Sequence, residues 1–328
     1  MYLEHLEFLA CPRCFGSLSI AKTVQGGDGA LVEGALACPA CATEYPVIGG
    51  VPRFVPRENY ASGFGLEWTK HARTQYDSYS GIPASERRFF DQTHWPRDMR
   101  GQRIVEVGSG SGRFTEQAAV TGATVVSLDY SYAVDANYAS NGAKRNVLIV
   151  QADVFAMPFR SGTFDKLFCF GMLQHTPDPK RAFMALPRVL KPGGVLCADI
   201  YKVTAFHTFL HPKYWVRPLT RHMNPDRLYA RVRAWVDFMW PLATLIRKLP
   251  KGHSINWRLL LVADYSQLGL KGDMLKEWAY LDTFDMLAPR YDRPATLSIF
   301  RKWGVEAGLV DVDGEYSTHG VTLRGRAP

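Results

Sequence analysis

Three glycines at alternate positions restrict the fold of this chain more than any other feature: Gly108, Gly110 and Gly112. A short strand pattern, 103–107, precedes them, and a helical pattern, 113–121, follows them. Glycine permits a sharp turn between the two because it adopts positive φ angles without steric cost. A strand, a glycine turn and a helix in this order predict a β-α-β unit of a parallel sheet, whose ligand lies beyond the carboxyl ends of the strands.

Acidic residues near this turn indicate what it binds. The next strand, 124–128, ends at Asp129, which is placed to accept hydrogen bonds from both hydroxyls of a ribose. Asp153 follows the third strand and can accept from an adenine amino group, while Val154 offers its backbone N–H. Glu106 precedes the first glycine, where an acid would oppose a pyrophosphate but suits the ammonium of methionine. The set therefore favours a methionine-bearing nucleoside over a dinucleotide.

Residues 101–201 resemble, element by element, the class I S-adenosylmethionine-dependent methyltransferases, and among them the family called methyltransferase type 11. A fourth strand at 164–170 and a turn into a fifth strand at 190–196 complete the series. The resemblance implies S-adenosyl-L-methionine as the co-substrate, with the three glycines along its methionine, Glu106 at its amino group and Asp129 on its ribose. The other cofactor-binding residues that it implies are Ser109, Tyr130, Asp153, Val154 and Gly171.

Four of the six cysteines form two matched Cys-Pro-x-Cys pairs: Cys11, Cys14, Cys38 and Cys41. Two such turns direct four thiolates at one ion and complete a tetrahedral site without a water ligand. The pattern predicts a structural metal, either zinc or iron in a rubredoxin-like site. Cys169 and Cys197 fall in apolar runs and are expected to be inert buried thiols.

The segment 9–56 resembles the small zinc-ribbon subunit that activates several eukaryotic methyltransferases, here in the same chain as the catalytic domain. A cysteine module followed by a methyltransferase also resembles the bacterial ribosomal-RNA guanine-N1 methyltransferases, whose last zinc ligand is usually histidine. This chain has cysteine at the corresponding place, Cys41.

The expected fold is α/β: a Rossmann-like, doubly wound sheet with a closing antiparallel hairpin, a small N-terminal zinc ribbon and a helical insertion after the fifth strand. The patterns divide the chain into a zinc-ribbon module (1–56), a linker or lid (57–100), a cofactor-binding core (101–201), a helical substrate cap (202–293) and a final helix with the hairpin (294–328). The final helix is expected to start at Pro294 and to stop at Gly308.

The insertion is strongly basic and aromatic. Residues 201–260 contain eleven Lys and Arg against Asp226 and Asp237, a net charge of +9, whereas the whole chain carries +8. The same stretch holds four of the eight tryptophans. RNA, an anionic lipid headgroup or a pyrophosphate-linked precursor would suit such a surface. A solvated charged face over an aromatic core would produce the same composition.

A general base is needed if the methyl acceptor is a hydroxyl, and histidine is the usual choice. His175 lies in a His-x-x-Asp-Pro turn that resembles one frequent in small-molecule and lipid methyltransferases, where the histidine either acts in catalysis or organises the loop. Asp285 and Tyr291, in the polar and aromatic strip 281–292, are further candidates for catalysis or acceptor contact. Enzymes that methylate adenine amino groups or glutamine amides usually carry an Asn/Asp-Pro-Pro-aromatic run after the fourth strand. This chain has Phe170-Gly171-Met172-Leu173 at that place, which argues against both kinds of acceptor.

The favoured function is methyl transfer to an anionic small-molecule, lipid-linked or glycan-linked metabolite. Two alternatives stay open: methylation of a ribosomal or transfer RNA base, and a regulatory protein that binds S-adenosylmethionine without catalysis. No stretch approaches the ~18 apolar residues of a membrane span, and the first residues lack the apolar core of a signal peptide. A cytoplasmic location is therefore expected, with a membrane-peripheral one allowed by the basic insertion.

Overall fold

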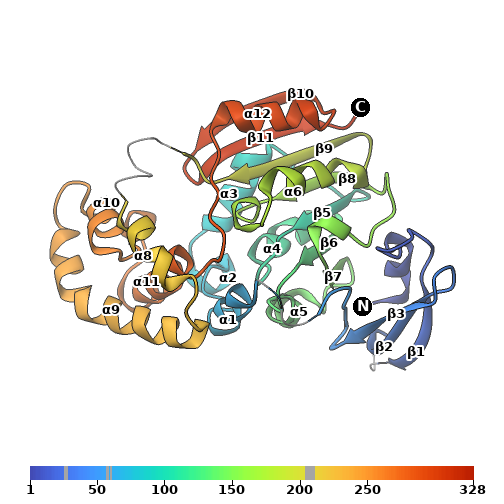
Figure 1. The fold of residues 1–328 in the computed structure, drawn as a ribbon, viewed down its shortest axis with the longest axis horizontal. Coiled ribbons are helices and arrows are strands. Elements are labelled where there is room, and N and C mark those ends of the chain that lie inside the picture. Colours follow the sequence, from blue (N-terminus) through green and yellow to red (C-terminus); the bar gives the residue numbers. More distant parts are fainter. Residues whose placement is uncertain (26–28, 57–58, 60, 204–210) are drawn as a thin grey trace.

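The computed structural model describes residues 1–25, 29–56, 59, 61–203 and 211–328. Its centre is a seven-stranded sheet in the order β10-β11-β9-β8-β5-β6-β7 (Figure 1). The strands are β5 (Arg103–Val107), β6 (Thr124–Asp129), β7 (Val147–Gln151), β8 (Phe164–Cys169), β9 (Leu190–Ile200), β10 (Val310–Ser317) and β11 (Gly320–Arg326). Strands β5 to β9 pair in parallel, and β11 is antiparallel to both β9 and β10. The expected doubly wound sheet with its closing hairpin is confirmed.

Helices cover both faces of the sheet because its strands alternate apolar side chains toward two cores. One core contains Ile104 and Phe114 under α3, α4 and α5, and the other contains Val105 and Phe300 under α6 and α12. The helices are α3 (Ala84–Thr93), α4 (Arg113–Ala119), α5 (Val134–Asn141), α6 (Pro179–Ala185) and α12 (Leu297–Glu306).

The last helix begins at Leu297, so the expectation that Pro294 starts it is wrong. The Thr296 side chain accepts a hydrogen bond from the N–H of Ile299 and caps the first turn, which sets the start three residues later. At the other end, Gly308 adopts a φ of +75° directly after the cap residue, in line with its expected role as the stop.

The N-terminal module is a four-stranded antiparallel sheet in the order β1-β2-β3-β4, preceded by a 3-10 helix at Leu3–Phe8. Its strands are β1 (Ser19–Gln25), β2 (Leu31–Cys38), β3 (Thr43–Ile48) and β4 (Val51–Pro52). The module joins the free edge of the large sheet, since Phe54 N donates to Gln151 O at 2.8 Å and Ala10 N donates to Pro158 O at 2.8 Å. Its apolar side chains belong to the same core as those of β6 and β7.

The insertion forms a helical lobe beside the carboxyl ends of the parallel strands (Figure 1). It consists of α8 (Pro212–Thr220), α9 (Pro225–Ile246), α10 (Gly252–Ile255), a π-helical turn at Asn256–Leu260, a 3-10 turn at Ser266–Leu268 and α11 (Gly272–Leu287). The lobe has its own core, in which Val232 and Val236 pack with Phe284. Two linker helices, α1 (Ser62–Lys70) and α2 (Asp77–Ser80), lie between the lobe and the sheet. No helix in the described part of the chain has the length and apolar character to cross a membrane.

Candidate functional site

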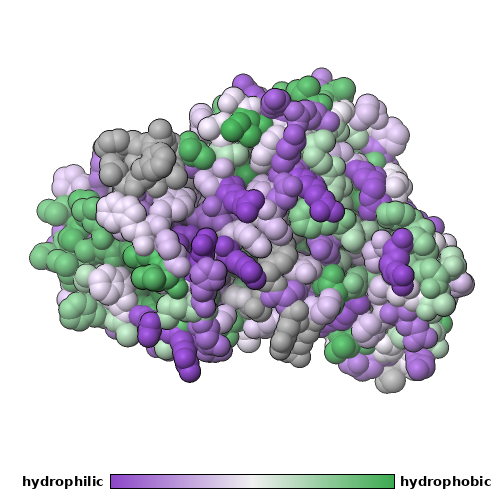
Figure 2. All heavy atoms as spheres, in the orientation of Figure 1, coloured by the Kyte–Doolittle hydropathy of each residue, from purple (hydrophilic) through white to green (hydrophobic). Residues whose placement is uncertain are grey.

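A cavity of about 1260 Å³ lies where β5, β6 and β8 end. Its walls come from the glycine turn, the linker helices, the helical lobe and the turn between β10 and β11. Polar side chains gather on the surface between the lobe and the sheet (Figure 2). The volume exceeds the roughly 300–1,000 Å³ typical of a site for one small ligand, so the cavity has room for two reactants side by side.

The three glycines all adopt left-handed conformations, with φ of +86° at Gly108, +53° at Gly110 and +94° at Gly112. A Cβ at Gly112 would lie 2.1 Å from Asn137 Oδ1, and one at Gly108 would lie 2.4 Å from Met172 Cβ. Both positions therefore need glycine for backbone conformation and for close packing. Gly108, Ser109 and Gly110 line the cavity, whereas Gly112 packs against α5.

Asp129 closes the end of β6 and lines the cavity beside the glycine turn. Its carboxylate accepts hydrogen bonds from Gly110 N at 2.8 Å, from Ser131 N at 2.8 Å and from Ser131 Oγ at 2.7 Å. Burial raises the pKa of Asp129 despite these donors. The carboxylate therefore ties the turn to the strand end and still presents lone pairs to the cavity.

Glu106 is buried below the glycine turn and does not line the cavity. One of its oxygens accepts from Thr115 Oγ1 and from Ser127 Oγ, while Oε1 has no hydrogen-bond partner among the described residues. Burial raises the pKa of Glu106 to about 8. A buried oxygen without a donor fits a role toward an ammonium group, because such a partner would satisfy it.

The predicted adenine side is assembled at the ends of β6 and β7. Asp153, Val154 and Tyr130 all line the cavity. Asp153 caps a 3-10 turn, Val154–Ala156, by accepting from Phe155 N at 2.9 Å. This turn therefore holds both the Asp153 carboxylate and Val154 at the cavity wall.

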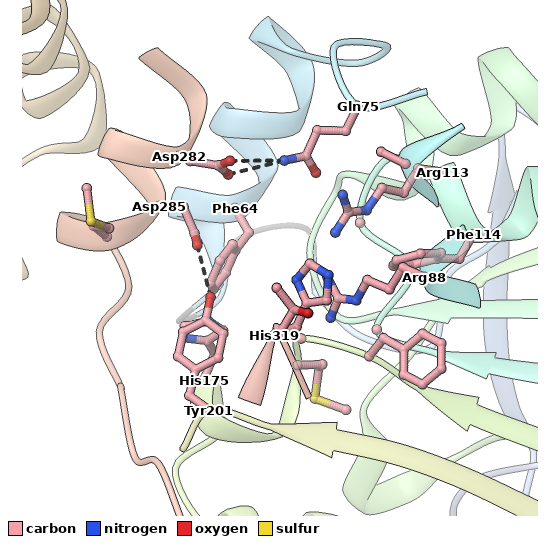
Figure 3. Close-up of a pocket in the computed structure, with 18 of the residues that line it drawn as sticks. Phe64, Gln75, Arg88, Arg113, Phe114, His175, Tyr201, Asp282, Asp285 and His319 are labelled. Atoms are coloured by element: carbon pink, nitrogen blue, oxygen red, sulfur yellow. Dashed lines mark hydrogen bonds between the residues drawn. The ribbon is translucent and has the colours of Figure 1, made fainter. Parts of the chain in front are cut away.

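Gly171 follows β8 and lines the cavity, and its surroundings include residues that the sequence did not indicate. Its N–H donates to Asp199 Oδ1 at 2.6 Å, and the other oxygen of Asp199 accepts from Arg88 Nη2 at 2.7 Å. The Arg88 guanidinium lies over the ring of Phe114 (Figure 3). It also lies over the ring of Phe170. A charged residue within the apolar run of β9 is the signal that could have identified Asp199.

Arg113, the first residue of α4, is a second cavity arginine that the sequence analysis did not single out. It forms no ion pair with a carboxylate of the described residues, and burial lowers its pKa to about 10. Figure 3 shows Arg113, Arg88 and His319 directed toward the same part of the cavity. Burial, followed by these two arginine charges, lowers the pKa of His319. This wall offers donors for an anionic group.

The candidate base, His175, lies in the opposite wall, in a 3-10 turn after β8. Its Nδ1 is 3.0 Å from the carbonyl oxygen of Tyr291, and its ring packs against Phe64 and Tyr201. The Tyr201 hydroxyl donates to Asp285 Oδ2 at 3.3 Å (Figure 3). Tyr201 therefore connects His175 with Asp285, since its ring contacts the imidazole and its hydroxyl donates to the carboxylate. Tyr291 contacts the imidazole through its backbone carbonyl.

Carboxyl groups from the lobe and the linker face the cavity above Tyr201. Burial raises the pKa of Asp282 to about 7, and Gln75 Nε2 donates to this carboxyl at 3.2 and 3.3 Å. Burial and the charges of Asp285 and Asp282 raise the pKa of Glu67 well above its usual value. Glu67 Oε2 has no partner among the described residues. The sequence analysis identified Asp285 but missed the other two carboxyls.

The four predicted metal ligands converge within the N-terminal module. Their Sγ atoms all lie within 4.8 Å of one another: Cys11, Cys14, Cys38 and Cys41. The Sγ atoms of Cys14 and Cys38 are 3.4 Å apart, and those of Cys11 and Cys41 are 3.6 Å apart. Both distances are close to the roughly 3.8 Å edge of a tetrahedron with zinc–sulfur bonds of about 2.3 Å. The same turn occurs after each pair, with Phe15 and Ala42 left-handed at φ of +58° and +54°. The donor set fits a structural zinc ion.

The strand order, the glycine turn and the cavity at the strand ends together define a class I methyltransferase domain. Residues 105–198 match the family model described as "Methyltransferase domain", and residues 3–50 match the model described as "Trm112p-like protein". The chain thus carries a methyltransferase domain after a Trm112p-like zinc-ribbon domain. The resemblances to class I methyltransferases and to the zinc-ribbon activator subunit are confirmed.

Several curated proteins are similar to this chain. A demethylmenaquinone methyltransferase of Renibacterium salmoninarum is 30% identical over 42% of this chain and 61% of its own length. A ubiquinone biosynthesis O-methyltransferase of Xanthomonas oryzae is 34% identical over 30% of this chain and 43% of its own length. An uncharacterised chloroplastic methyltransferase of Arabidopsis thaliana is 25% identical over 60% of this chain and 62% of its own length. The chain thus spans less than two thirds of these relatives.

Among solved structures, one similar to this chain is the complex between the Haloferax volcanii Trm112 methyltransferase activator and a methyltransferase. Its TM-score is 0.40 at 15% identity, with 82% of this chain and 92% of that chain covered.

Proposed function

We propose that this protein transfers the methyl group of S-adenosylmethionine to an anionic small-molecule, lipid-linked or glycan-linked metabolite. The observation that carries the proposal is the cavity itself, which is lined by the glycine turn, Asp129, Asp153 and Gly171 and also by the candidate base His175. Because the cavity is larger than one small ligand needs, an acceptor fits beside the donor.

Each wall has a part in the proposed reaction. Asp129 binds the ribose, Asp153 and Val154 bind the adenine, and Glu106 supports the amino group. Tyr130 stacks near the adenine. The acceptor atom attacks the methyl carbon as the carbon–sulfur bond breaks, and S-adenosylhomocysteine leaves. His175 accepts the proton that an acceptor hydroxyl loses, and its Nδ1 is held by the Tyr291 carbonyl. Alignment of the two reactants lowers the activation free energy by on the order of 7–11 kcal/mol.

The anionic character of the acceptor rests on cations without internal partners. Arg258 lines the cavity and forms no ion pair with an acid of the described residues. Arg113 likewise has no carboxylate partner in the part of the chain that the structure describes, and it suits the methionine carboxylate or an acceptor anion. Lys213, in contrast, is neutralised by Asp292 at 3.0 Å.

A metabolite is favoured over RNA by the names of the relatives. Two of them are named for demethylmenaquinone and for ubiquinone biosynthesis, both of which are small molecules. RNA methylation stays the second candidate because of the basic insertion. We also propose a cytoplasmic location, with a membrane-peripheral one favoured by the basic insertion.

We also infer that one structural zinc ion is held by the four cysteines of the N-terminal module. Four thiolates leave no open position for a substrate, so the ion organises the module and takes no part in methyl transfer.

Calorimetry with S-adenosylmethionine tests the donor. We expect the wild type to bind and Asp129→Ala to lose binding, whereas Asp311→Ala, a change at an exposed carboxylate on β10, should bind as the wild type does. Absence of binding by the wild type would reject the proposal.

Transfer of a radiolabelled methyl group tests the acceptor. The protein is incubated with labelled donor and either an organic-solvent extract or total RNA from cells. Label in the extract supports a metabolite acceptor, and label in RNA supports the second candidate. Donor binding without transfer to either fraction would favour the regulatory protein.

A further inference from the structure

Helix α9 exposes a row of large apolar side chains that no part of the described chain covers. The row consists of Trp235, Phe238, Leu242 and Leu245 of α9, and two further exposed residues extend it: Leu249 in the turn after the helix, and Leu259 in the π-helical turn. The exposed fraction is 75% for Phe238, 62% for Leu245 and 70% for Leu259. Spacings of three and four residues place the row on one side of a helix. We call these six residues the apolar stripe.

The stripe is distinct from the face that α9 buries. Leu228, Val232 and Val236 fill the core of the lobe together with Phe284 of α11. Trp235 Nε1 donates to Leu260 O at 2.9 Å and holds the π-helical turn beside the helix. Figure 2 shows hydrophobic side chains gathered on this lobe, over α9 and α10. Contiguous exposed apolar surface is typical of interaction sites, because apolar side chains are more stable when they are removed from water.

Exposed cations lie next to the stripe: Arg227, Arg231, Lys248, Lys251 and Arg258. None of them forms an ion pair with an acid of the described residues, whereas Arg247, the C-cap residue of α9, pairs with Asp264 at 2.9 Å. Arg231 precedes Trp235 by one helical turn, Lys248 adjoins Leu249, and Arg258 adjoins Leu259. The surface therefore combines aromatic and aliphatic groups with positive charge that no acid of the described residues neutralises.

We propose that the apolar stripe and its cations dock this protein on the surface of an anionic lipid bilayer. Tryptophan, phenylalanine and leucine enter the boundary between headgroups and acyl chains, and lysine and arginine pair with anionic headgroups. A second copy of the chain fits less well, since a two-fold contact would bring these cations together. RNA would neutralise the cations but would leave the exposed leucines uncovered.

The docking surface adjoins the cavity through one short segment. His253, Ser254, Trp257 and Arg258 line the cavity, and the next residue, Leu259, belongs to the stripe. A bilayer on the stripe would present a lipid-borne acceptor beside the cavity. This second step rests on the proposed methyl transfer, whereas the docking itself does not.

Vesicle sedimentation tests the docking without donor or acceptor. The probes are phosphatidylcholine vesicles with and without about a third phosphatidylglycerol. We expect the wild type to bind the anionic vesicles, and binding should weaken at high salt. The double variant Phe238→Ser/Leu245→Ser should bind at least on the order of tenfold more weakly, because two large apolar side chains can no longer leave water on docking. The matched control is Ile299→Ser/Val305→Ser, which changes two exposed apolar residues of α12 and should bind as the wild type does.

A charge-reversal variant tests the electrostatic part. Lys248→Glu/Lys251→Glu should lose binding to anionic vesicles, and Lys302→Glu on α12 should retain it. All these changes are at exposed side chains, so the variants should keep the melting temperature and the donor affinity of the wild type.

The proposal is overturned if the wild type ignores anionic vesicles or if the stripe variant binds them unchanged. It is also overturned if the wild type dimerises or binds RNA and the stripe variant alone loses that association. Donor binding by calorimetry separates these results from a failure of the proposed methyl transfer. A variant that binds donor but not vesicles supports docking, and a wild type that binds vesicles but not donor rejects the transferase alone.

Discussion

Arg88 of α3 forms an ion pair with Asp199 of β9 at 2.7 Å, and both side chains are almost completely buried. The second oxygen of Asp199 accepts the N–H of Gly171 at 2.6 Å. One carboxylate thus connects the linker helix α3, the strand β9 and the loop at Gly171 that lines the cavity. The linker is therefore part of the site rather than a tether between domains.

Loss of this carboxylate should destabilise the whole domain. Asp199→Ala leaves Arg88 charged and buried without its partner, which costs about 3–5 kcal/mol of unfolding free energy in urea titrations. The control is Asp98→Ala, which breaks the exposed pair with Arg100 and should leave the free energy of unfolding nearly unchanged. Similar losses in both variants would contradict the structural role of the buried pair.

Glu106 should make stability fall as the pH rises. Its pKa is raised from 4.5 to about 8 by burial, so the folded protein holds this proton more tightly than the unfolded chain does. The resulting stability is complete below about pH 4.5 and is lost as the pH rises through about 8. Because one pKa unit corresponds to about 1.4 kcal/mol, Glu106→Gln should reduce the loss between pH 5 and pH 8.5 by on the order of 3 kcal/mol.

Urea unfolding at a series of pH values measures this difference, and Glu44→Gln, at an exposed position of β3, should follow the wild type. Parallel curves for Glu106→Gln and the wild type would contradict the prediction. The same variant should bind S-adenosylmethionine more weakly if Glu106 supports its ammonium group.

Metal analysis should find about one zinc ion per chain. Cys38→Ser removes one of four ligands and should lose the metal. Its melting temperature should fall for the methyltransferase domain too, because the module and the large sheet share one core. Cys197→Ser, at a buried thiol of β9 far from the cluster in sequence, should keep the zinc. Full zinc content in Cys38→Ser would exclude the four-cysteine site.

His175→Ala should lower kcat with the identified acceptor by roughly 10²–10⁴-fold while the donor affinity stays close to that of the wild type. Added imidazole should restore part of the activity, because it can accept the proton in the space that the side chain vacates. His222→Ala, at an exposed position outside the cavity, is the control. An activity loss that imidazole does not relieve, with a matching loss of stability, would assign His175 to loop organisation.

Local patterns in the sequence were enough to predict the architecture. The strand pattern at 124–128 corresponds to β6 at Thr124–Asp129, and the glycine turn lies between β5 and α4 as expected. Both signals depend on backbone preferences and side-chain alternation over a few residues. The convergence of the four thiols was also predictable, because each Cys-x-x-Cys turn orients its own pair before the two pairs meet.

Tertiary packing decided which polar groups meet in the cavity and directly behind its wall. Gln75 and Asp282 are separated by 207 residues, and Arg88 and Asp199 by 111, so no short-range pattern links either pair. The candidates His175 and Asp285 were visible as single residues, but their connection through Tyr201 was not.

The insertion shows the same limit most clearly. The sequence alone determined its composition: eleven basic residues against two acidic ones, and four tryptophans. Only the fold decided that Arg217 is buried against backbone carbonyls, that Arg247 pairs with Asp264 and that Phe238 faces water. Composition counts charges and rings, whereas exposure depends on which helix face the rest of the chain covers. Burial is a long-range property, and for this surface it was settled by how α9 packs on α11.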